Sequence, residues 1–243
     1  MEKLKHPEAP GQKNKIPGSA PGTLQAVYYT DPLCCWSWAF ETVWQQFKTV
    51  YKKQLNIRYC MGGLLQQWQG YHDPLLSVSR PAQMGPIWMQ VNHTTGVPLD
   101  STIWFRDPPA SSYPACLAVK CAGMQSPAME EQYLYLARKA VMTQQQNIAR
   151  KEVLLQLGVT LAAETKGAFN ALQFSKDLEE LAALEACNKD IQEVKNRGIS
   201  RFPSLLFTAV HHRQSVMLTG YRPYEELEKI IEKLMHGDMK SER

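Results

Sequence analysis

The sequence lacks a hydrophobic run long enough to span a bilayer, because charged residues interrupt every helical segment of its 243 residues. Residues 1–22, MEKLKHPEAPGQKNKIPGSAPG, contain no apolar core of a secretory signal and are rich in Pro, Gly and Lys. We therefore expect a flexible tail there. These absences predict a protein that is located in the cytoplasm and has no membrane partner.

The sequence also has little excess charge. Lys and Arg number 27 and Asp and Glu number 23, which gives a net charge of +4, and the lysines are densest in the first sixteen residues. Such a mild and mixed charge argues against a nucleic-acid partner. With 44% hydrophobic residues, the chain can bury one sizeable core, or form one domain with a large insertion.

Cysteines are too few for a disulfide-stapled scaffold of this length, so we expect most of them to be reduced. No two show the C-x2-C spacing of zinc sites, and the six histidines do not cluster with them, so the sequence predicts no metal site. The cysteines are Cys34, Cys35, Cys60, Cys116, Cys121 and Cys187.

The N-terminal third has the pattern of a strand, a helix and a second strand. TLQAVYYT (23–30) is β-branched and aromatic, which indicates a buried strand, and the Asp-Pro that follows it indicates a turn. WSWAFETVWQQFKTVYKK (36–53) has apolar residues at helical spacing, and LNIRYCMGGL (55–64) predicts a strand that ends at a glycine pair. Short joints between these segments predict a parallel βαβ unit.

The rest of the chain is helical and then returns to strands. Residues 65–187 contain helical runs such as 128–142 and 151–161. SLLFTAV (204–210) and QSVMLTG (214–220) predict an antiparallel hairpin, and a closing helix is expected from near Pro223 to near Gly237. This order predicts an α/β protein with a thioredoxin fold formed by 23–64 and 188–243, and an inserted helical subdomain formed by 65–187.

Cys34 is the candidate nucleophile. It follows the first predicted strand, at the carboxyl edge of the sheet where α/β proteins bind ligands, and it stands at the start of a helix. Free N–H groups and the helix dipole at such a place stabilise a thiolate and lower the pKa of a cysteine from its usual value of about 8.5. A thiolate is the species that attacks a disulfide.

Ser37 stands where a C-x-x-C motif would have its second cysteine. A hydroxyl can donate a hydrogen bond to the Cys34 thiolate, but it cannot form a disulfide. A mixed disulfide on Cys34 must therefore be resolved by an external thiol, such as glutathione, or by another cysteine.

Two cysteines are candidates for that resolving role. A disulfide between Cys35 and its neighbour would need a strained ring, so Cys35 is more simply explained as a small buried residue, or as part of the substrate surface. Cys60, at the end of the second strand, is on the same sheet edge as Cys34, although a buried core cysteine is the commoner case. Trp36 lies between Cys34 and Ser37 and could offer a flat apolar surface to a substrate.

The segment GISRFPSLLF contains the second site element. Phe202-Pro203 directly precedes an apolar strand, and a cis peptide there would expose the backbone of Phe202 to an incoming chain. An ordinary trans proline at a strand start is the alternative.

Three motifs together resemble the DsbA-like thioredoxin-fold family, in its FrnE-like branch. DPLCCWSW is similar to the D-P-L-C-x-W-C-W/Y segment, and MGGL and GISRFPSLLF resemble the glycine turn and the cis-proline loop. The similarity covers roughly residues 23 to 236. It implies that Cys34 is the nucleophile and that Pro203 is a cis-proline facing it. The chain departs from the family pattern at Ser37, where cysteine is usual, and at Arg201, where a small residue is common.

These observations leave three hypotheses. In the first, the protein is a monothiol oxidoreductase or isomerase of thiol- or disulfide-containing proteins or small molecules, with no tightly bound cofactor and with glutathione as a co-substrate. In the second, it is a glutathione-dependent transferase or isomerase of a small apolar substrate. In the third, suggested by a resemblance to ClpXP adaptor members of the branch, it binds a protein partner without catalysis.

Overall fold

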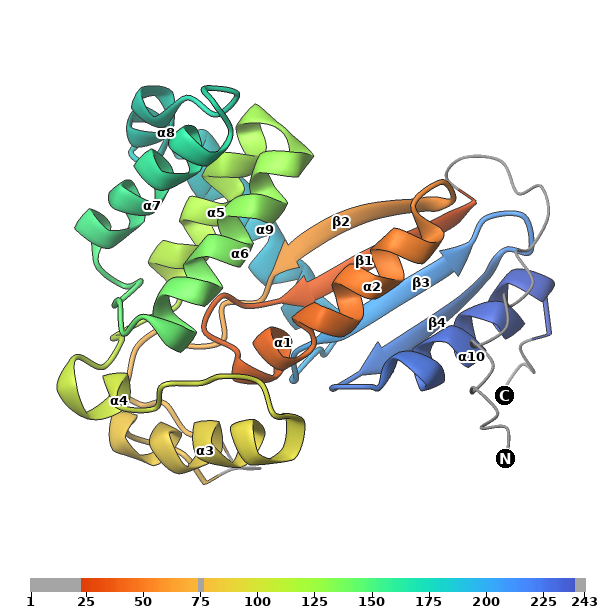
Figure 1. Ribbon diagram of the computed structural model, residues 1–243, viewed down its shortest axis with the longest axis horizontal. Helices are drawn as coiled ribbons and strands as arrows, with labels where there is room; N and C mark the ends of the chain where they lie inside the picture. Colours follow the sequence, from red (N-terminus) through yellow and green to blue (C-terminus); the bar gives the residue numbers. More distant parts are fainter. Residues whose placement is uncertain (1–22, 74–76, 239–243) are drawn as a thin grey trace, which may run out of the picture.

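A four-stranded sheet forms one half of the computed structural model, which describes residues 23–73 and 77–238 (Figure 1). Its order is β2-β1-β3-β4, with β2 parallel to β1 and the other two neighbouring pairs antiparallel. The predicted parallel βαβ unit and the C-terminal hairpin are therefore confirmed, and with them the thioredoxin fold. The strands are β1 Leu24–Thr30, β2 Leu55–Met61, β3 Ser204–Ala209 and β4 Gln214–Thr219.

Helices cover both faces of this sheet. Because side chains alternate along a strand, neighbouring tyrosines of β1 face opposite layers. Tyr28 packs edge-on against Trp44 of α2 (Glu41–Tyr51), whereas Tyr29 donates a hydrogen bond from its hydroxyl to Glu193 of α9 (Leu181–Asn196). The closing helix α10 (Tyr224–His236) begins after Pro223 and is capped by Gly237, as the sequence predicts.

The prediction of a single helix over 36–53 is wrong in one respect. The structure divides it into α1 (Cys35–Ala39) and α2, with a one-residue turn at Phe40. Phe40 keeps right-handed angles and donates its N–H to the Trp36 carbonyl, so the chain continues in nearly the same course. The consequence is that the helix carrying Ser37 is only five residues long.

The inserted segment packs at the end of the sheet toward which β1 and β2 point (Figure 1). It is helical, as predicted, apart from an isolated bridge between Asp73 and Val78. The division of the chain at residue 187 stays a prediction, and α9 runs continuously through that position. The predicted tail, 1–22, lies outside the described residues. The elements of the insertion are η1 Pro81–Gln83, α3 Met84–Thr95, α4 Ile103–Arg106, α5 Tyr113–Gln125, α6 Pro127–Thr143, α7 Lys151–Glu164 and α8 Ala171–Asp177.

Candidate active site

Cys34 lies at the carboxyl end of β1 and is the N-cap residue of α1. Its Sγ accepts a hydrogen bond from the Ser37 N–H at 3.4 Å and donates one to the Phe202 carbonyl oxygen at 3.4 Å. The side chain is nearly closed off, since only 7% of Cys34 is exposed. The structure thus brings together the start of α1 and the loop before β3, which are far apart in the sequence.

The loop that faces Cys34 contains the predicted cis-proline. The Phe202–Pro203 peptide is cis, and the Pro203 carbonyl accepts a hydrogen bond of 2.7 Å from the N–H of Gly220 at the end of β4. The Phe202 ring packs on Gly62, where a Cβ atom would lie 2.1 Å from a ring carbon. This explains why the turn after β2 carries glycine, because any side chain there would displace the ring.

The Cys34 thiol does not have a lowered pKa in this conformation. Burial raises its pKa, and the nearby carboxyl group of Asp31 raises it further, while Ser37 and Arg138 act in the opposite direction. The prediction of a lowered pKa is therefore wrong for this conformation. The physical reason is that a helix of one and a half turns offers a weak dipole, which does not outweigh the loss of water around the sulfur.

Ser37 has an unsatisfied hydroxyl next to the sulfur. The residue is completely buried, and its Oγ has no hydrogen-bond partner among the described residues. The hydroxyl nevertheless lies near enough to Cys34 to lower its pKa. A buried O–H with no acceptor is costly, so this donor is available for a charged sulfur when one forms.

Asp31 is a site residue that the sequence analysis missed. It is fully buried, and its carboxylate accepts hydrogen bonds from Leu33 N (2.8 Å), Leu64 N (2.7 Å), Ser112 Oγ (2.9 Å) and Cys116 Sγ (3.3 Å). It thereby joins the Cys34 loop, the glycine turn and the first turn of α5. The Asp-Pro pair was available as a signal, but it indicated only a turn.

A buried arginine from the insertion is the second missed residue. Arg138 of α6 donates hydrogen bonds to Glu41 Oε2 at 2.8 Å and to Thr30 Oγ1, and its guanidinium carbon lies 5.6 Å from the centre of the Tyr28 ring. Only 1% of its surface is exposed. Nothing in the local sequence distinguishes this arginine from surface arginines, since its partners come from distant segments.

The structure does not support any of the remaining cysteines as a disulfide partner for Cys34. Cys35 is 4% exposed and belongs to the main core, so the assignment of Cys35 to the substrate surface is not supported. Cys116 and Cys121 point to different partners, Asp31 and the Phe174 carbonyl. All six cysteines are free thiols.

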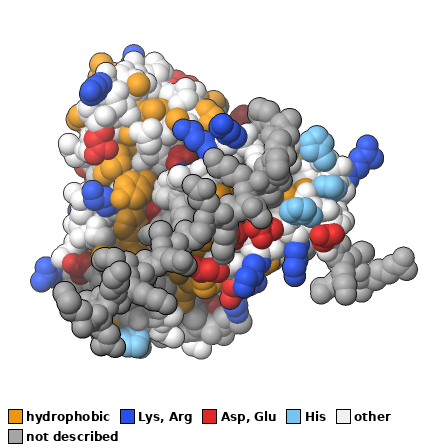
Figure 2. All heavy atoms as spheres, turned by 45° about the vertical axis from the view of Figure 1, so that its right-hand side comes forward, with side chains coloured by type: hydrophobic (Ala, Val, Ile, Leu, Met, Phe, Trp, Pro, Cys, Tyr) orange, Lys and Arg blue, Asp and Glu red, His pale blue; other side chains and the backbone are white. Residues whose placement is uncertain are grey.

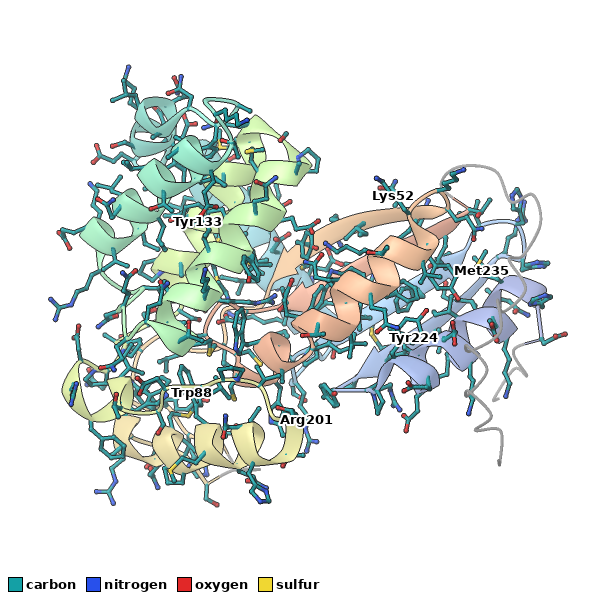
Figure 3. All side chains as sticks on the ribbon, viewed as in Figure 1. Lys52, Trp88, Tyr133, Arg201, Tyr224 and Met235 are labelled. Carbon is teal, nitrogen blue, oxygen red and sulfur yellow. The ribbon has the colours of Figure 1, made fainter. Side chains whose placement is uncertain are left out.

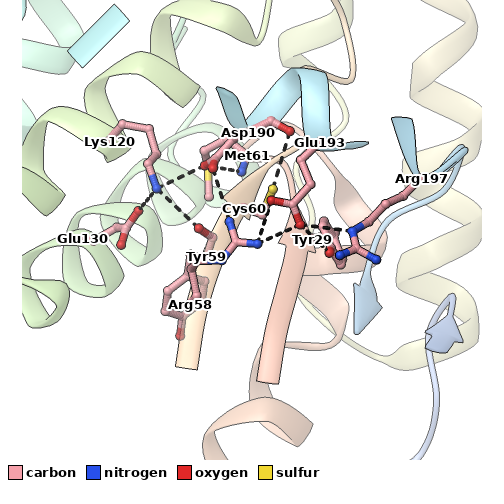
Figure 4. Close-up of polar contacts among 10 residues, drawn as sticks. All are labelled: Tyr29, Arg58, Tyr59, Cys60, Met61, Lys120, Glu130, Asp190, Glu193 and Arg197. Atoms are coloured by element: carbon pink, nitrogen blue, oxygen red, sulfur yellow. Dashed lines mark hydrogen bonds and ion pairs between the residues drawn. The ribbon is translucent and has the colours of Figure 1, made fainter. Parts of the chain in front are cut away.

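Cys60 does share an apolar cluster with Cys34, but it is held elsewhere. Its thiol donates to the Asp190 carbonyl at 3.5 Å, and burial together with the carboxyl groups of Asp190 and Glu193 raises its pKa. Figure 4 shows the surrounding network, in which Lys120 bridges Glu130 and Asp190, and Glu193 accepts from Tyr29 and Arg58. Cys60 is therefore a poor nucleophile fixed by a structural network.

Trp36 and Phe202 form the apolar rim around the sulfur. Trp36 is half-buried, and its ring centre lies 6.0 Å from that of Tyr221, whereas Trp38 and Trp44 are buried in the core. Within residues 23–73 and 77–238 there is no group of three His, Cys, Asp or Glu side chains that could hold a metal ion. None of the described helices combines the length and hydrophobicity needed to cross a bilayer.

Comparisons with known proteins agree with this fold. The sequence pattern of a family described as thioredoxin matches residues 28–229. A curated relative is the ClpXP adapter protein SpxH of Halalkalibacterium halodurans, which is 25% identical over 213 residues, 87% of this chain and 68% of SpxH.

Solved structures show the same fold. A protein from Nitrosomonas europaea, named as a candidate disulfide isomerase, has a TM-score of 0.70 and 24% identity, covering 88% of this chain and 98% of that one. The cytosolic disulfide reductase DsbM from Pseudomonas aeruginosa has a TM-score of 0.61 and 19% identity, covering 88% and 93%. DsbM has also been solved with glutathione.

Proposed function

Because this chain belongs to the thioredoxin family, we propose that it is a monothiol thiol-disulfide oxidoreductase or isomerase with Cys34 as its nucleophile. One observation carries the proposal. The Cys34 sulfur lies 3.4 Å from the backbone of the cis-proline loop, with a buried serine in place of a second thiol.

The proposed reaction exchanges disulfides in two balanced steps. The Cys34 thiolate attacks one sulfur of a disulfide R–S–S–R′, so that a Cys34–S–S–R bond forms, the original S–S bond breaks and R′–S⁻ leaves to take a proton from water. The thiolate of a second molecule, such as glutathione, then attacks the sulfur of R. A new disulfide between that thiol and R forms, the bond between R and Cys34 breaks, and Cys34 leaves as a thiolate that regains a proton. The attacking thiol is thereby oxidised and R′–SH is the reduced product.

The other site residues have supporting roles in this proposal. Ser37 donates its free hydroxyl to the Cys34 thiolate in the leaving step, which lowers the energy of the charged sulfur. The Phe202 backbone beside Pro203 holds the substrate chain, and Trp36 and the Phe202 side chain provide apolar surface. No tightly bound cofactor is required, and glutathione serves as co-substrate, an assignment supported by the glutathione complex of the structurally similar DsbM.

The proposed location is the cytoplasm. This rests on the similarity to DsbM, which is named as cytosolic. Glutathione and reducing conditions there would keep the mixed disulfide of Cys34 transient.

A second candidate function is a protein-binding adaptor, favoured by the similarity to SpxH. Several large apolar side chains are exposed on the helical half, among them Val159, Leu172 and Leu181, and Figure 2 shows hydrophobic side chains on that side of the molecule. Contiguous exposed apolar surface often marks protein interaction sites. An adaptor would retain its partner after Cys34→Ala, whereas the oxidoreductase would lose turnover.

A glutathione-dependent transferase would be distinguished by saturable glutathione binding that survives Cys34→Ala.

Trapping the intermediate tests the main proposal. The protein is incubated with 2-hydroxyethyl disulfide, and the adduct is located by intact-mass and peptide mass spectrometry. We expect one adduct on Cys34 that glutathione removes, no adduct in Cys34→Ala, and an internal disulfide in Ser37→Cys. An adduct on another cysteine, or turnover unchanged by Cys34→Ala, would contradict the proposal.

A further inference from the structure

We infer that Arg201 is a specificity-determining residue, which favours disulfide substrates that carry a carboxylate close to the reacting sulfur. The inference rests on the proposed disulfide exchange at Cys34. It adds the chemical class of the substrate, namely an anionic disulfide.

The position of Arg201 is fixed relative to Cys34 by the backbone. Arg201 directly precedes Phe202, whose carbonyl accepts the Cys34 thiol at 3.4 Å. The carbonyl of Arg201 itself accepts a hydrogen bond of 2.8 Å from Ser204 Oγ at the start of β3. Figure 3 shows Arg201 below α1. The backbone that carries the Arg201 cation is thus held one residue away from the carbonyl that contacts the sulfur.

Arg201 also keeps its charge available. The residue is exposed, and its guanidinium makes no ion pair or hydrogen bond with any residue of 23–73 or 77–238. Two other arginines do have ion-pair partners: Arg197 pairs with Glu193 at 3.2 Å, and Arg222 pairs with Glu226 at 3.4 Å. A guanidinium in this state can bind a carboxylate through two parallel N–H donors without first losing an internal partner.

The surroundings of the sulfur make this charge decisive. Cys34 is packed with Tyr29, Cys60, Val194 and Phe202, which offer no charge to an approaching substrate. The buried Asp31 and Arg138 are engaged with internal partners. Among the residues of the loop that faces Cys34, Ile199 to Pro203, Arg201 alone is charged. A substrate with a carboxylate on the arm bearing its sulfur therefore meets an attractive group, and one with an ammonium group meets a repulsive one.

Three symmetrical disulfides with different charges test this inference: 3,3′-dithiodipropionate (anionic), 2-hydroxyethyl disulfide (neutral) and cystamine (cationic). The rate of adduct formation on Cys34 is measured for the wild type and for Arg201→Glu at low salt and at 1 M salt. For charges about 7 Å apart in water, Coulomb's law gives about a sevenfold rate change on charge reversal. We expect Arg201→Glu to slow the anionic probe by about that factor, to accelerate the cationic probe similarly, and to change the neutral probe by less than about twofold. These differences should vanish at 1 M salt, where charges are screened beyond about 3 Å.

Arg213→Glu is the matched control, because it makes the same change of net charge at the exposed tip of the β3–β4 hairpin, at the opposite end of β3 from Arg201. It should leave all three rates within about twofold of the wild type. Equal effects of the two variants, or no change of charge preference in Arg201→Glu, would overturn the inference. If the neutral probe fails to react with Cys34 in the wild type, the proposed exchange fails instead.

Discussion

The contact between Gly62 and the Phe202 ring gives the sharpest test of how the site is built. In Gly62→Ala the new Cβ would lie 2.1 Å from one ring carbon and within 2.7 Å of two others. Restoring an ordinary contact of 3.4 Å requires a shift of about 1.3 Å in a ring that is 92% buried. Overpacking of this kind costs about 2 kcal/mol, which for a chain of this size lowers Tm by about 4–8 °C.

The displacement should also reach the sulfur. Phe202 supplies the carbonyl that accepts the Cys34 thiol, so moving its ring and backbone loosens the cover over Cys34. We expect faster alkylation of Cys34 by iodoacetamide in Gly62→Ala, measured by mass spectrometry beside a thermal melt.

A second glycine offers a matched control. In Gly85→Ala the new Cβ would lie 2.8 Å from the Phe105 ring, but Phe105 is 64% exposed and can turn away. This substitution lies in α3, where alanine is favoured, so we expect a loss of less than about 0.5 kcal/mol. In a Phe202→Ala background the cost of Gly62→Ala should fall below about 0.5 kcal/mol. If Gly62→Ala costs no more than Gly85→Ala, or costs the same with and without the Phe202 ring, the packing argument is refuted.

Three further predictions concern charge near the sulfur. Because burial raises the pKa of Cys34 above its usual range, the thiol is mostly protonated at pH 7, so alkylation should accelerate about tenfold per pH unit up to at least pH 8; a plateau below pH 7 would contradict this. Ser37→Ala removes a group that lowers that pKa, so its alkylation profile should move to higher pH, whereas a move to lower pH would show that the hydroxyl does not face the sulfur. Arg138→Met leaves Glu41 buried and unpaired, so urea denaturation should show a loss of about 3–5 kcal/mol, and a loss below about 1 kcal/mol would show that the pair is not needed.

Local sequence patterns were sufficient for the order of elements and for the centre of the site. Alternation and aromatic content marked β1 and β3, helical spacing marked α6 and α10, and the turn residues fixed their ends. Cys34 at a strand-to-helix junction and Pro203 before an apolar strand follow from the same local rules. These features depend on neighbouring residues in the chain, so the sequence alone was enough to predict them. The break between α1 and α2 at Phe40 could not be predicted in this way, because Phe40 keeps helical backbone angles there.

The protonation state of the site depends on tertiary structure. The Phe202 carbonyl, the Asp31 hydrogen bonds and the Arg138 guanidinium reach the Cys34 region from segments that lie far away in the sequence. Sequence alone placed a cysteine at a helix start, and from that we expected an acidic thiol. Folding buries the sulfur and gives its proton a carbonyl acceptor, and the resulting loss of water outweighs the dipole of a five-residue helix. Burial is a property of the whole packed chain, so only the tertiary structure could decide it.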